Sequence, residues 1–330
     1  MKSKISKRTG IIIFCGLAAI MADIIVIHHN PLADRQEELL KKAVSCGVIV
    51  VSCVLFGLLY DKITSLPLEL YHSRRLIWKL AKNDFKKRYA GSFFGVIWAL
   101  VQPVVTVVMY WLVFDVIMNG AGRAMRGGEE IPFVLFLTAG LVPWFYFNEA
   151  WTNGTMALLE YNYLVKKVVF KISVLPIIKI IGATFVHVFF VGILLVIACF
   201  YGYFPTVYTL QVVYYSICTF VLVLALSYST CALVVFMRDI SQIINIILQV
   251  GMWATPIMWD FGAISSGWAV FLKLNPMVYI VNGYRSAIYE HSWFWEDFFS
   301  TMYFWIITVV LFGVGALIFK KLKVHFADVL

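Results

Sequence analysis

Apolar runs of membrane-spanning length alternate with short charged clusters along most of the chain. No Asp, Glu, Lys or Arg interrupts the 26 residues between Arg88 and Asp115 or the 22 residues between Asp297 and Lys320. A helix that crosses a bilayer needs ~20 mostly apolar residues. Gaps of this kind predict six spans, with a turn at 201–205 between the third and the fourth. We expect the spans at about residues 91–118, 131–152, 178–201, 207–236, 240–259 and 299–319.

Two shorter apolar runs precede these spans. Fourteen uncharged residues lie between Arg8 and Asp23, and 18 lie in a second gap that ends before Asp61. Because no A-x-A site closes the first run and a second run follows it, the pattern favours a retained transmembrane hairpin over a cleaved signal peptide. We therefore expect an additional hairpin at 1–65, followed by a main domain at 66–330.

The composition excludes an ordinary soluble domain. Hydrophobic residues make up 62% of the 330 and charged residues 14%, whereas about 25% of residues are charged in soluble proteins. A net charge of +9 would suit nucleic-acid binding in a soluble protein, but beside such apolar runs it is typical of cytoplasmic loops. With the N-terminus inside, 20 of the 27 Lys and Arg residues fall on the cytoplasmic side. We expect a multi-pass protein with both termini cytoplasmic and no nucleic-acid partner.

Residues 71–90 form a basic amphipathic stretch before the first of the six spans. On a helix, its apolar and basic residues fall on opposite faces. The apolar stripe holds Ile77, Trp78, Ala81, Phe85 and Tyr89, and the basic stripe holds Arg75, Lys79, Lys82 and Lys86. This pattern predicts an interfacial helix that sinks its apolar face into the headgroup boundary. A basic flank that only sets the topology is the alternative.

The segment 160–176, between the second and third spans, is unusually apolar and basic for a loop. Lys166, Lys167 and Lys171 stand there among five apolar residues. The pattern predicts a short amphipathic helix, ended by Pro176, that fits a groove on a soluble subunit. A plain connector is the alternative.

A long insertion at 260–298 separates the last two spans on the opposite side. It is rich in aromatic residues and holds two breaker pairs, Asn275-Pro276 and Asn282-Gly283. These pairs predict short half-buried helices, which at membrane depth need protein cover or a water-filled cavity. An interfacial aromatic belt is the alternative.

Seven motifs, taken in order, resemble those of a known family. They are GSFFGVIWALVQPVV, GLVPWFYFNEA, NYLVKKVVFKISVLP, MRDISQI, WATPIMW, LNPMVYIVNGYRSAI and HFADVL. With the basic helix before them they resemble the ABC-2 type permeases that export polysaccharides, and the closest relatives look like teichoic acid, O-antigen and capsule translocation permeases. The resemblance covers about residues 70–330, and the hairpin at 1–65 departs from the six-span family pattern. It implies an all-α polytopic protein of the bacterial cytoplasmic (inner) membrane.

The resemblance implies a transport subunit that draws its energy from another polypeptide. Permeases of this kind form homodimers, bind two cytosolic ABC ATPase subunits and move an undecaprenyl-pyrophosphate-linked glycan outward. This chain has no Gly-Lys dipeptide and hence no P-loop, so ATP and Mg are expected on the partner ATPase and no cofactor on this chain. Its six cysteines form no CxxC pair and predict no metal site.

The resemblance also assigns roles to two segments. The coupling segment, which receives the movement of the ATPase, contains Asn162, Lys166, Lys167, Phe170, Lys171 and Pro176. External gate helices are expected over 262–298. Their candidate residues are Asn275, Pro276, Tyr279, Tyr284 and Arg285.

A glycan path through lipid needs flat aromatic walls with scattered polar groups. The candidates are Tyr110, Trp111, Trp144, Phe145, Tyr146, Phe147, Trp253 and Trp259, each with core packing or an aromatic belt as the alternative.

A substrate pyrophosphate needs cations at the cytoplasmic headgroup level. Arg74, Arg75, Lys79, Lys82 and Arg88 are suitably spaced for it, and anionic membrane lipid is the rival ligand.

Two other functions remain open at this stage. One is an ABC-2 exporter of a drug, a peptide or a small lipid. The other is a membrane glycosyltransferase, but the external acids and histidines show no paired-carboxylate or nucleophile–base spacing, so we expect no enzyme and no catalytic residues. His187 lies inside a predicted span. Apart from tyrosine and cysteine, it is the only ionisable residue between Lys179 and Arg238, and we expect it to form a hydrogen bond between helices.

Overall fold

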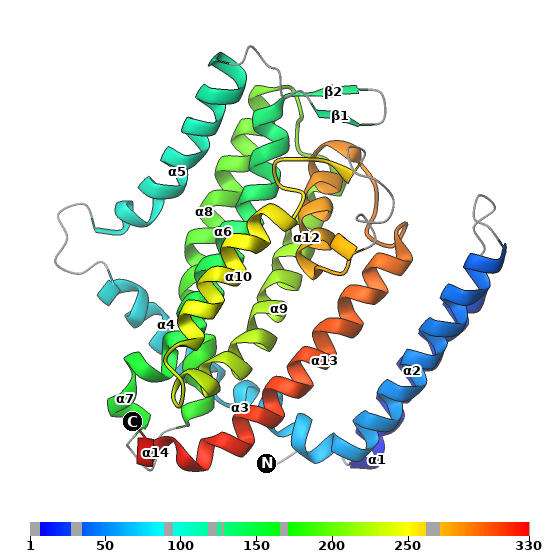
Figure 1. Cartoon of the computed structure of the whole chain (residues 1–330), viewed down its shortest axis with the longest axis vertical. Helices are drawn as coiled ribbons and strands as arrows, with labels where there is room; N and C mark the ends of the chain where they lie inside the picture. The colour runs from blue at the N-terminus through cyan, green and yellow to red at the C-terminus, as the bar shows by residue number, and fades with distance from the viewer. Residues whose placement is uncertain are drawn as a thin grey trace. The chain divides into compact units, whose positions relative to one another are not determined.

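The computed structural model describes residues 7–27, 35–88, 95–117, 124–126, 129–165, 171–261 and 271–329. The described part is helical apart from one short β-hairpin (Figure 1). It divides into two compact units, within Met1–Tyr71 and His72–Leu330, and each is described by itself.

The first unit is a pair of packed helices, α1 (Lys7–Ile27) and α2 (Arg35–Ile63), followed by α3 (Ser65–His72). The rings of Phe14 and Phe56 stack between them, with centroids 4.0 Å apart. α1 is long and apolar enough to cross a membrane, whereas α2 is apolar only over Ser45–Leu58. The insertion of this pair as a transmembrane hairpin therefore stays a prediction.

The centre of the second unit is formed by α6 (Phe133–Glu160), α8 (Leu175–Phe200) and α9 (Gln211–Val234), which pack on one another (Figure 1). A fourth helix, α13 (Phe298–Leu322), lies along α9. α6 is the most enclosed, since 83% of its most apolar window is buried, against 39% for the corresponding window of α13. A helix that is apolar on every face can be surrounded by others, and this is the position of α6.

Small residues set the spacing of these helices. A Cβ at Gly315 of α13 would lie 2.7 Å from the carbonyl oxygen of Ala225 in α9, and a Cβ at Gly154 of α6 would meet the Ser227 hydroxyl. The missing side chains thus let α13 and α6 approach α9 closely, as small residues commonly do between membrane helices.

Two further helices carry apolar faces that the described chain leaves uncovered. They are α5 (Trp98–Trp111), which continues as the π-helix η2 (Leu112–Ile117), and α10 (Ile240–Ala254). On α10 only Ile244 and Leu248 are buried. The exposed large side chains of α10 are Ile243, Ile246, Ile247, Val250 and Trp253.

The helix of the fifth predicted span is shorter than expected. The span was placed at 240–259, but α10 ends at Ala254. Thr255 has φ −96° and ψ 138°, and Pro256 follows it. A residue before proline is pushed out of the helical region, which explains the early end.

The region after α10 contains α12 (Pro276–Arg285) and the π-helix η6 (Ser286–Glu290), which lie at one end of α6 and α9 (Figure 1). Asn275-Pro276 begins a short helix as predicted. Asn282-Gly283 was expected to break the segment, and this is wrong, because both residues lie inside α12. Glycine is needed at 283 for another reason: the ring of Tyr215 occupies the place of a Cβ.

The remaining elements are short. They are η1 (Gly95–Ile97), η3 (Ile172–Val174), η4 (Val207–Leu210), η7 (Lys323–His325), α4 (Arg74–Arg88), α7 (Asn162–Val165), α14 (Phe326–Val329) and the antiparallel strands β1 (Ala124–Arg126) and β2 (Glu129–Ile131). The strands form a small hairpin that the sequence analysis did not anticipate.

Several helices in the described part of the chain are long and apolar enough to cross a membrane. They are Arg8–Ile27, Phe133–Glu160, Ile172–Phe200, Val207–Val234 and Phe298–His325. The expected class, an all-α polytopic membrane protein, is therefore confirmed.

Candidate functional site

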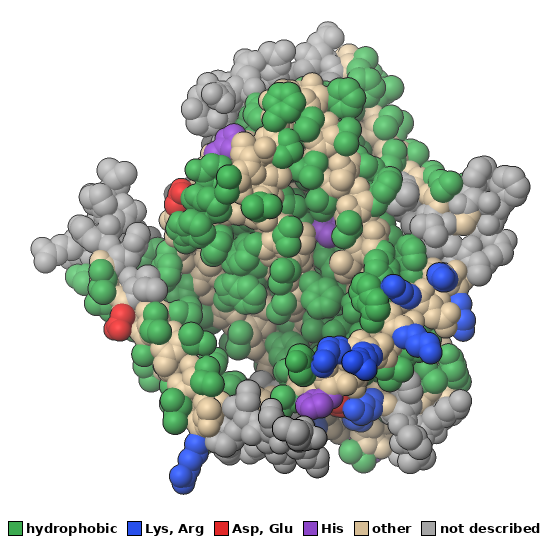
Figure 2. Space-filling view, turned by 180° about the vertical axis from the view of Figure 1, so that it is seen from behind, with side chains coloured by type: hydrophobic (Ala, Val, Ile, Leu, Met, Phe, Trp, Pro, Cys, Tyr) green, Lys and Arg blue, Asp and Glu red, His purple; other side chains and the backbone are tan. Residues whose placement is uncertain are grey.

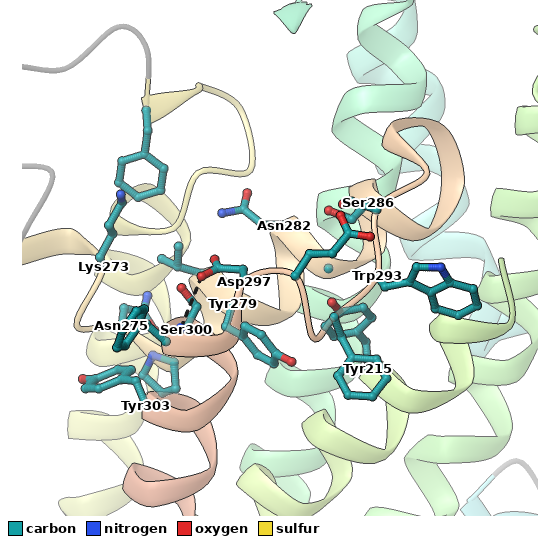
Figure 3. Close-up of a pocket in the computed structure, with 18 of the residues that line it drawn as sticks. Tyr215, Lys273, Asn275, Tyr279, Asn282, Ser286, Trp293, Asp297, Ser300 and Tyr303 are labelled. Carbon is teal, nitrogen blue, oxygen red and sulfur yellow. Dashed lines mark hydrogen bonds between the residues drawn. The ribbon is translucent and has the colours of Figure 1, made fainter. Parts of the chain in front are cut away.

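A cavity of about 700 Å³ lies beside α12 (Figure 3). Its wall combines one face of α12, the first turn of α13 and the segments on either side of them. The aromatic lining residues are Tyr215, Phe261, Tyr279, Trp293, Phe294, Phe299 and Tyr303. The polar and charged lining residues include Lys273, Asn275, Asn282, Ser286, Glu296, Asp297 and Ser300.

The start of α12 is fixed by Asn275. Its Oδ1 accepts a hydrogen bond from the Met277 backbone N–H at 3.0 Å, which caps the helix. Its Nδ2 donates to Thr255 Oγ1 at 2.8 Å, just after the end of α10. Pro276 occupies the first turn, where its lack of an N–H costs no hydrogen bond. Asn275 and Pro276 therefore orient α12 relative to α10.

Tyr279 belongs to a hydrogen-bonded aromatic cluster under the cavity. Its hydroxyl lies 3.1 Å from that of Tyr214 and 3.0 Å from Thr301 Oγ1. Its ring stacks on Phe304, with centroids 5.0 Å apart. Burial raises the pKa of the Tyr279 phenol well above its usual value, so the group stays neutral. Trp305 Nε1 extends the cluster by donating to the Tyr214 hydroxyl at 2.9 Å.

The far end of α12 is buried against the core by Tyr284 and His187. His187 Nε2 lies 3.0 Å from both Ser216 Oγ and the Tyr284 hydroxyl, and these two oxygens lie 2.7 Å apart. The ring of Tyr146 stacks on the imidazole, with centroids 4.3 Å apart. His187 is thus hydrogen-bonded between helices, as predicted.

Arg285 is completely buried at the end of α12. Its Nη2 donates to the Ile257 carbonyl at 2.9 Å and to the Phe136 carbonyl at 3.4 Å, and its guanidinium lies 3.5 Å from the centre of the Phe136 ring. A buried guanidinium with such contacts joins α12 to α6 and to the chain after α10. Of the five gate residues expected, Tyr284 and Arg285 face the protein core, and Asn275, Pro276 and Tyr279 line the cavity.

At the opposite end of α6 and α8, four side chains meet in what we call the charged cluster: Asp84, Glu160, Tyr161 and Lys179. Lys179 Nζ lies 2.8 Å from Asp84 Oδ1 and 2.6 Å from Glu160 Oε2. The Tyr161 hydroxyl donates to the same Asp84 oxygen. Burial and the neighbouring Asp84 raise the pKa of Tyr161, which keeps its hydroxyl protonated as a donor. Nearby, Lys171 Nζ donates to Ser73 Oγ at 3.2 Å.

The apolar face of α4 has a different partner from the one expected. Ile77 and Ala81 are buried, and Phe85 makes an edge contact with Phe185 of α8. For Ile77 and Ala81 the prediction of burial in the headgroup boundary is wrong, because α8 covers them. For the rest of this face it stays a prediction. Trp78 contacts the same Phe185 ring, yet remains 49% exposed. Tyr89 lies outside the described residues.

The basic side of α4 is exposed. Figure 2 shows Lys and Arg side chains gathered near one end of the molecular face that it presents. Arg74, Arg75, Lys79 and Lys82 are exposed, and the side chain of Arg88 lies outside the described part. Asp84, the acid of this helix, is buried, and the exposed side chains of Lys79 and Lys82 stand where an anionic ligand or partner could contact them.

Comparison with known proteins identifies the family. Residues 75–289 match the model of the ABC-2 type transporter family. This chain belongs to that family. It is similar to an O-antigen export system permease protein RfbA of Myxococcus xanthus, with 30% identity over 79% of this chain and 97% of the relative. A protein of the same name from Klebsiella pneumoniae is 25% identical over 77% of this chain and 95% of the relative. Membership makes the chain a multi-pass membrane subunit that works with an ABC ATPase.

In this ABC-2 chain, the expected coupling segment is described in part. Asn162 begins α7, and Lys171 contacts Ser73 as above, whereas Lys166, Lys167 and Phe170 lie outside the described residues. Pro176 was expected to end a helix, and this is wrong, because it stands in the first turn of α8. The first turn of a helix tolerates proline, since the N–H groups there have no partner within the helix.

The aromatic residues proposed for the substrate path do not gather around one cavity of the described chain. Trp144, Tyr146 and Phe147 are buried in the core, and Trp253 is 69% exposed on α10. Trp111 is exposed, and Tyr110, Phe145 and Trp259 are half-buried. None of the eight lines the cavity beside α12. Their role in a path stays a prediction.

Sequence reasoning missed several residues that the structure brings together. The sequence did indicate a special role for Asp84. It is the only acidic residue on a strongly basic helix, and it falls on the apolar side with Ile77 and Ala81. Its partner Lys179 stood at the edge of an apolar run. Tyr215 gave no signal of its own, because its position under α12 depends on how two distant segments pack.

Proposed function

We propose that this chain is the permease subunit of an ABC transporter that exports a lipid-linked polysaccharide across the bacterial cytoplasmic membrane, with O-antigen as the favoured class. The observation that carries the proposal is the similarity, at 24–30% identity, to permeases named for O-antigen export over 95–97% of their length. Teichoic acid or capsule polymers are the other members of the same substrate class.

The chemistry of the described surfaces supports a sugar polymer. A saccharide has apolar C–H faces and many hydroxyls, and it binds best where aromatic rings stand beside hydrogen-bonding side chains. The cavity beside α12 has that composition, with seven aromatic and several amide, hydroxyl and carboxylate groups in its wall. A small apolar drug would need a drier wall.

The proposed assembly contains two copies of this chain and two cytosolic ABC ATPase subunits. The uncovered apolar faces of α5 and α10 are the surfaces through which the two copies would meet. The exposed side of α4 and the segment around α7 would receive the ATPases, which carry ATP and Mg. Both termini would lie in the cytoplasm, as the distribution of Lys and Arg favours.

In this proposal the basic side of α4 receives the pyrophosphate of the undecaprenyl-linked glycan. Arg74, Arg75, Lys79, Lys82 and Arg88 supply charge-assisted hydrogen bonds at headgroup level. We expect Arg88→Ala to lower the stimulation of ATPase activity by the lipid-linked substrate without disturbing assembly. Unchanged stimulation and unchanged export in that variant would exclude a phosphate role for Arg88.

The test is reconstitution of the chain with its ATPase in vesicles that contain the lipid-linked polysaccharide of the host. We expect ATP-dependent movement of the glycan across the membrane, and none with an ATPase that binds but does not hydrolyse ATP. Movement of the glycan by the permease alone would overturn the proposal. ATPase stimulation by drugs or small lipids but not by the glycan would favour the other class of exporter.

A further inference from the structure

One face of α12 is polar although the rest of the helix is buried in an apolar core. Asn275, Tyr279, Asn282 and Ser286 are spaced by four, three and four residues, which places them on one helical stripe. The other faces bury Met277, Val278, Ile280, Val281 and Tyr284. The polar stripe faces the cavity of about 700 Å³ (Figure 3).

Asn282 is the member of this stripe that is available to a ligand. The Asn275 amide is already bonded to Met277 and Thr255, and the Ser286 hydroxyl donates to Glu290 at 2.8 Å. The Asn282 amide is half-buried and has no hydrogen-bond partner among the described residues. Figure 3 shows it projecting from α12 into the open space. A half-buried amide of this kind gains most from a ligand that both donates and accepts.

Rings from three segments line the same cavity as this amide. Tyr279 comes from α12 itself, Tyr303 from the start of α13 and Trp293 from the segment between them (Figure 3). Trp293 is held in place on both sides: Gln211 Nε2 donates to the Ser292 carbonyl at 2.9 Å, and the Phe294 N–H donates to Gln211 Oε1 at 2.7 Å. Gln211 is buried in α9 and is therefore a positioning residue for the cavity wall.

The charges around the cavity disfavour an anion. Glu296 and Asp297 are exposed at its rim, and Lys273 is the only Lys or Arg in the described lining. Lys273 is also engaged with the Phe261 ring, at 5.5 Å from its centre. A polymer with phosphate in every repeat would meet two carboxylates with one cation, which is an unfavourable arrangement.

We propose that the cavity beside α12 is a binding site for uncharged sugar residues of the exported glycan, separate from the aromatic residues expected along the path. Asn282 is the hydrogen-bonding group, and Tyr279 and Tyr303 are the rings against which the C–H face of a sugar lies. Trp293, whose ring stacks on Trp295 with centroids 4.5 Å apart, closes the wall of the cavity. A volume of about 700 Å³ is within the usual range for small-ligand sites and holds a short stretch of glycan. The site rests on the proposed function for its substrate class, and it favours a neutral polysaccharide over a phosphate-rich one such as teichoic acid.

The first test measures binding to the permease–ATPase complex in lipid nanodiscs without nucleotide. The probe is the host's surface polysaccharide, released from its lipid by mild acid, and titration calorimetry gives the dissociation constant. We expect Asn282→Leu to weaken binding about tenfold, because the sugar then faces a methyl group of similar size. The matched control is Asn148→Leu, at an exposed position of α6 that does not line this cavity, which should bind like the wild type.

The second test uses charge and avoids any dependence on folding of a core variant. The double variant Glu296→Gln, Asp297→Asn changes exposed residues only, and Asn can replace Asp297 as the cap of α13. Gln and Asn keep hydrogen-bonding groups at these positions but remove both negative charges. We expect the variant to bind poly(glycerol phosphate) at least fivefold more tightly than the wild type does. Equal binding of poly(glycerol phosphate) to both proteins would overturn the selectivity.

The outcomes separate this site from the function as a whole. Unchanged affinity of Asn282→Leu for the polysaccharide overturns the site, whatever the transport assay shows. If the lipid-linked glycan stimulates the ATPase but the freed polysaccharide does not bind, the site fails and the proposed function stands. If neither effect is seen, the proposed function fails with it.

Discussion

At the scale of single residues, the charged cluster contains two ion pairs of Lys179 that should contribute unequally to stability. The side chains of Lys179 and Asp84 are 7% and 9% exposed, whereas that of Glu160 is 48% exposed. An exposed pair is weak because water competes for both charges, but a buried charge that loses its partner is costly. The two contacts of Lys179 should therefore respond differently to substitution.

We expect Lys179→Met to destabilise the protein by about 3–5 kcal/mol, because it leaves Asp84 buried without its cation. Glu160→Gln keeps the buried pair and should cost at most about 1 kcal/mol. The thermal unfolding midpoint of each variant in nanodiscs checks the difference. Equal losses in the two variants would show that burial does not distinguish these pairs.

Gln211 offers a second prediction at this scale. Gln211→Leu removes both hydrogen bonds to the backbone of the segment that carries Trp293. It leaves a part-buried N–H and carbonyl unpaired, at a cost of about 1 kcal/mol each. We expect faster amide hydrogen exchange over residues 291–296 with little change in α6. Gln249→Leu, at an exposed position of α10, serves as the control. Unaltered exchange in the Gln211 variant would exclude a positioning role.

At the scale of helices, glycine contacts explain how α13 and α9 approach each other. The Cβ of an alanine at Gly315 would lie 2.7 Å from a backbone oxygen, which cannot rotate away. At Gly192 in α8, no atom lies within 4 Å of an added Cβ. These two positions make a matched pair in which the same substitution should have opposite effects.

Gly315→Ala should destabilise the protein by about 1–3 kcal/mol through overpacking. Gly192→Ala should be neutral or stabilise it by up to ~1 kcal/mol, because alanine loses less backbone entropy in a helix. Thermal unfolding of both variants, with the wild type in the same nanodiscs, provides the measurement. A stable Gly315→Ala protein would mean that α13 and α9 separate easily.

Helices of this protein were more predictable than the contacts between them. Charge-free runs located α6, α8, α9 and α13, because a span must be apolar over about 20 residues. The covering of α4 by α8 was not predictable, since the same apolar stripe suits a lipid headgroup and a neighbouring helix equally. The continuity of α12 through Gly283 was missed for a related reason: the need for glycine comes from Tyr215, which is 68 residues earlier in the sequence.

For the whole molecule, the uncovered face of α10 leads to a prediction about assembly. If a second copy covers it, cysteines introduced at Ile243, Ile247 and Val250 should form crosslinked dimers with a short bifunctional reagent in membranes, in a variant whose six native cysteines are replaced. Val196→Cys on the exposed side of α8 is the control and should not crosslink. Crosslinking that is equal at all four positions would indicate random collision rather than an interface.

The family and the all-α membrane class could be predicted for the whole molecule, but the site could not. Tyr279 and Asn275 were selected as gate residues and do line the cavity, whereas Arg285, chosen with them, is a buried clamp on Phe136 and Ile257. A guanidinium in an external loop looks the same in sequence in either role. Only the packing of α12 against α6 decides between them.

The early end of α10 leaves this helix too short to cross a bilayer by itself. Fifteen residues at 1.5 Å each extend about 22 Å, well below the ~30 Å hydrocarbon thickness of an average bilayer. The backbone beyond Ala254 must still find hydrogen bonds at that depth, and Asn275 and Arg285 provide some of them from within the protein. The polar backbone that follows Ala254 therefore has to be enclosed by protein wherever it lies within the hydrocarbon layer.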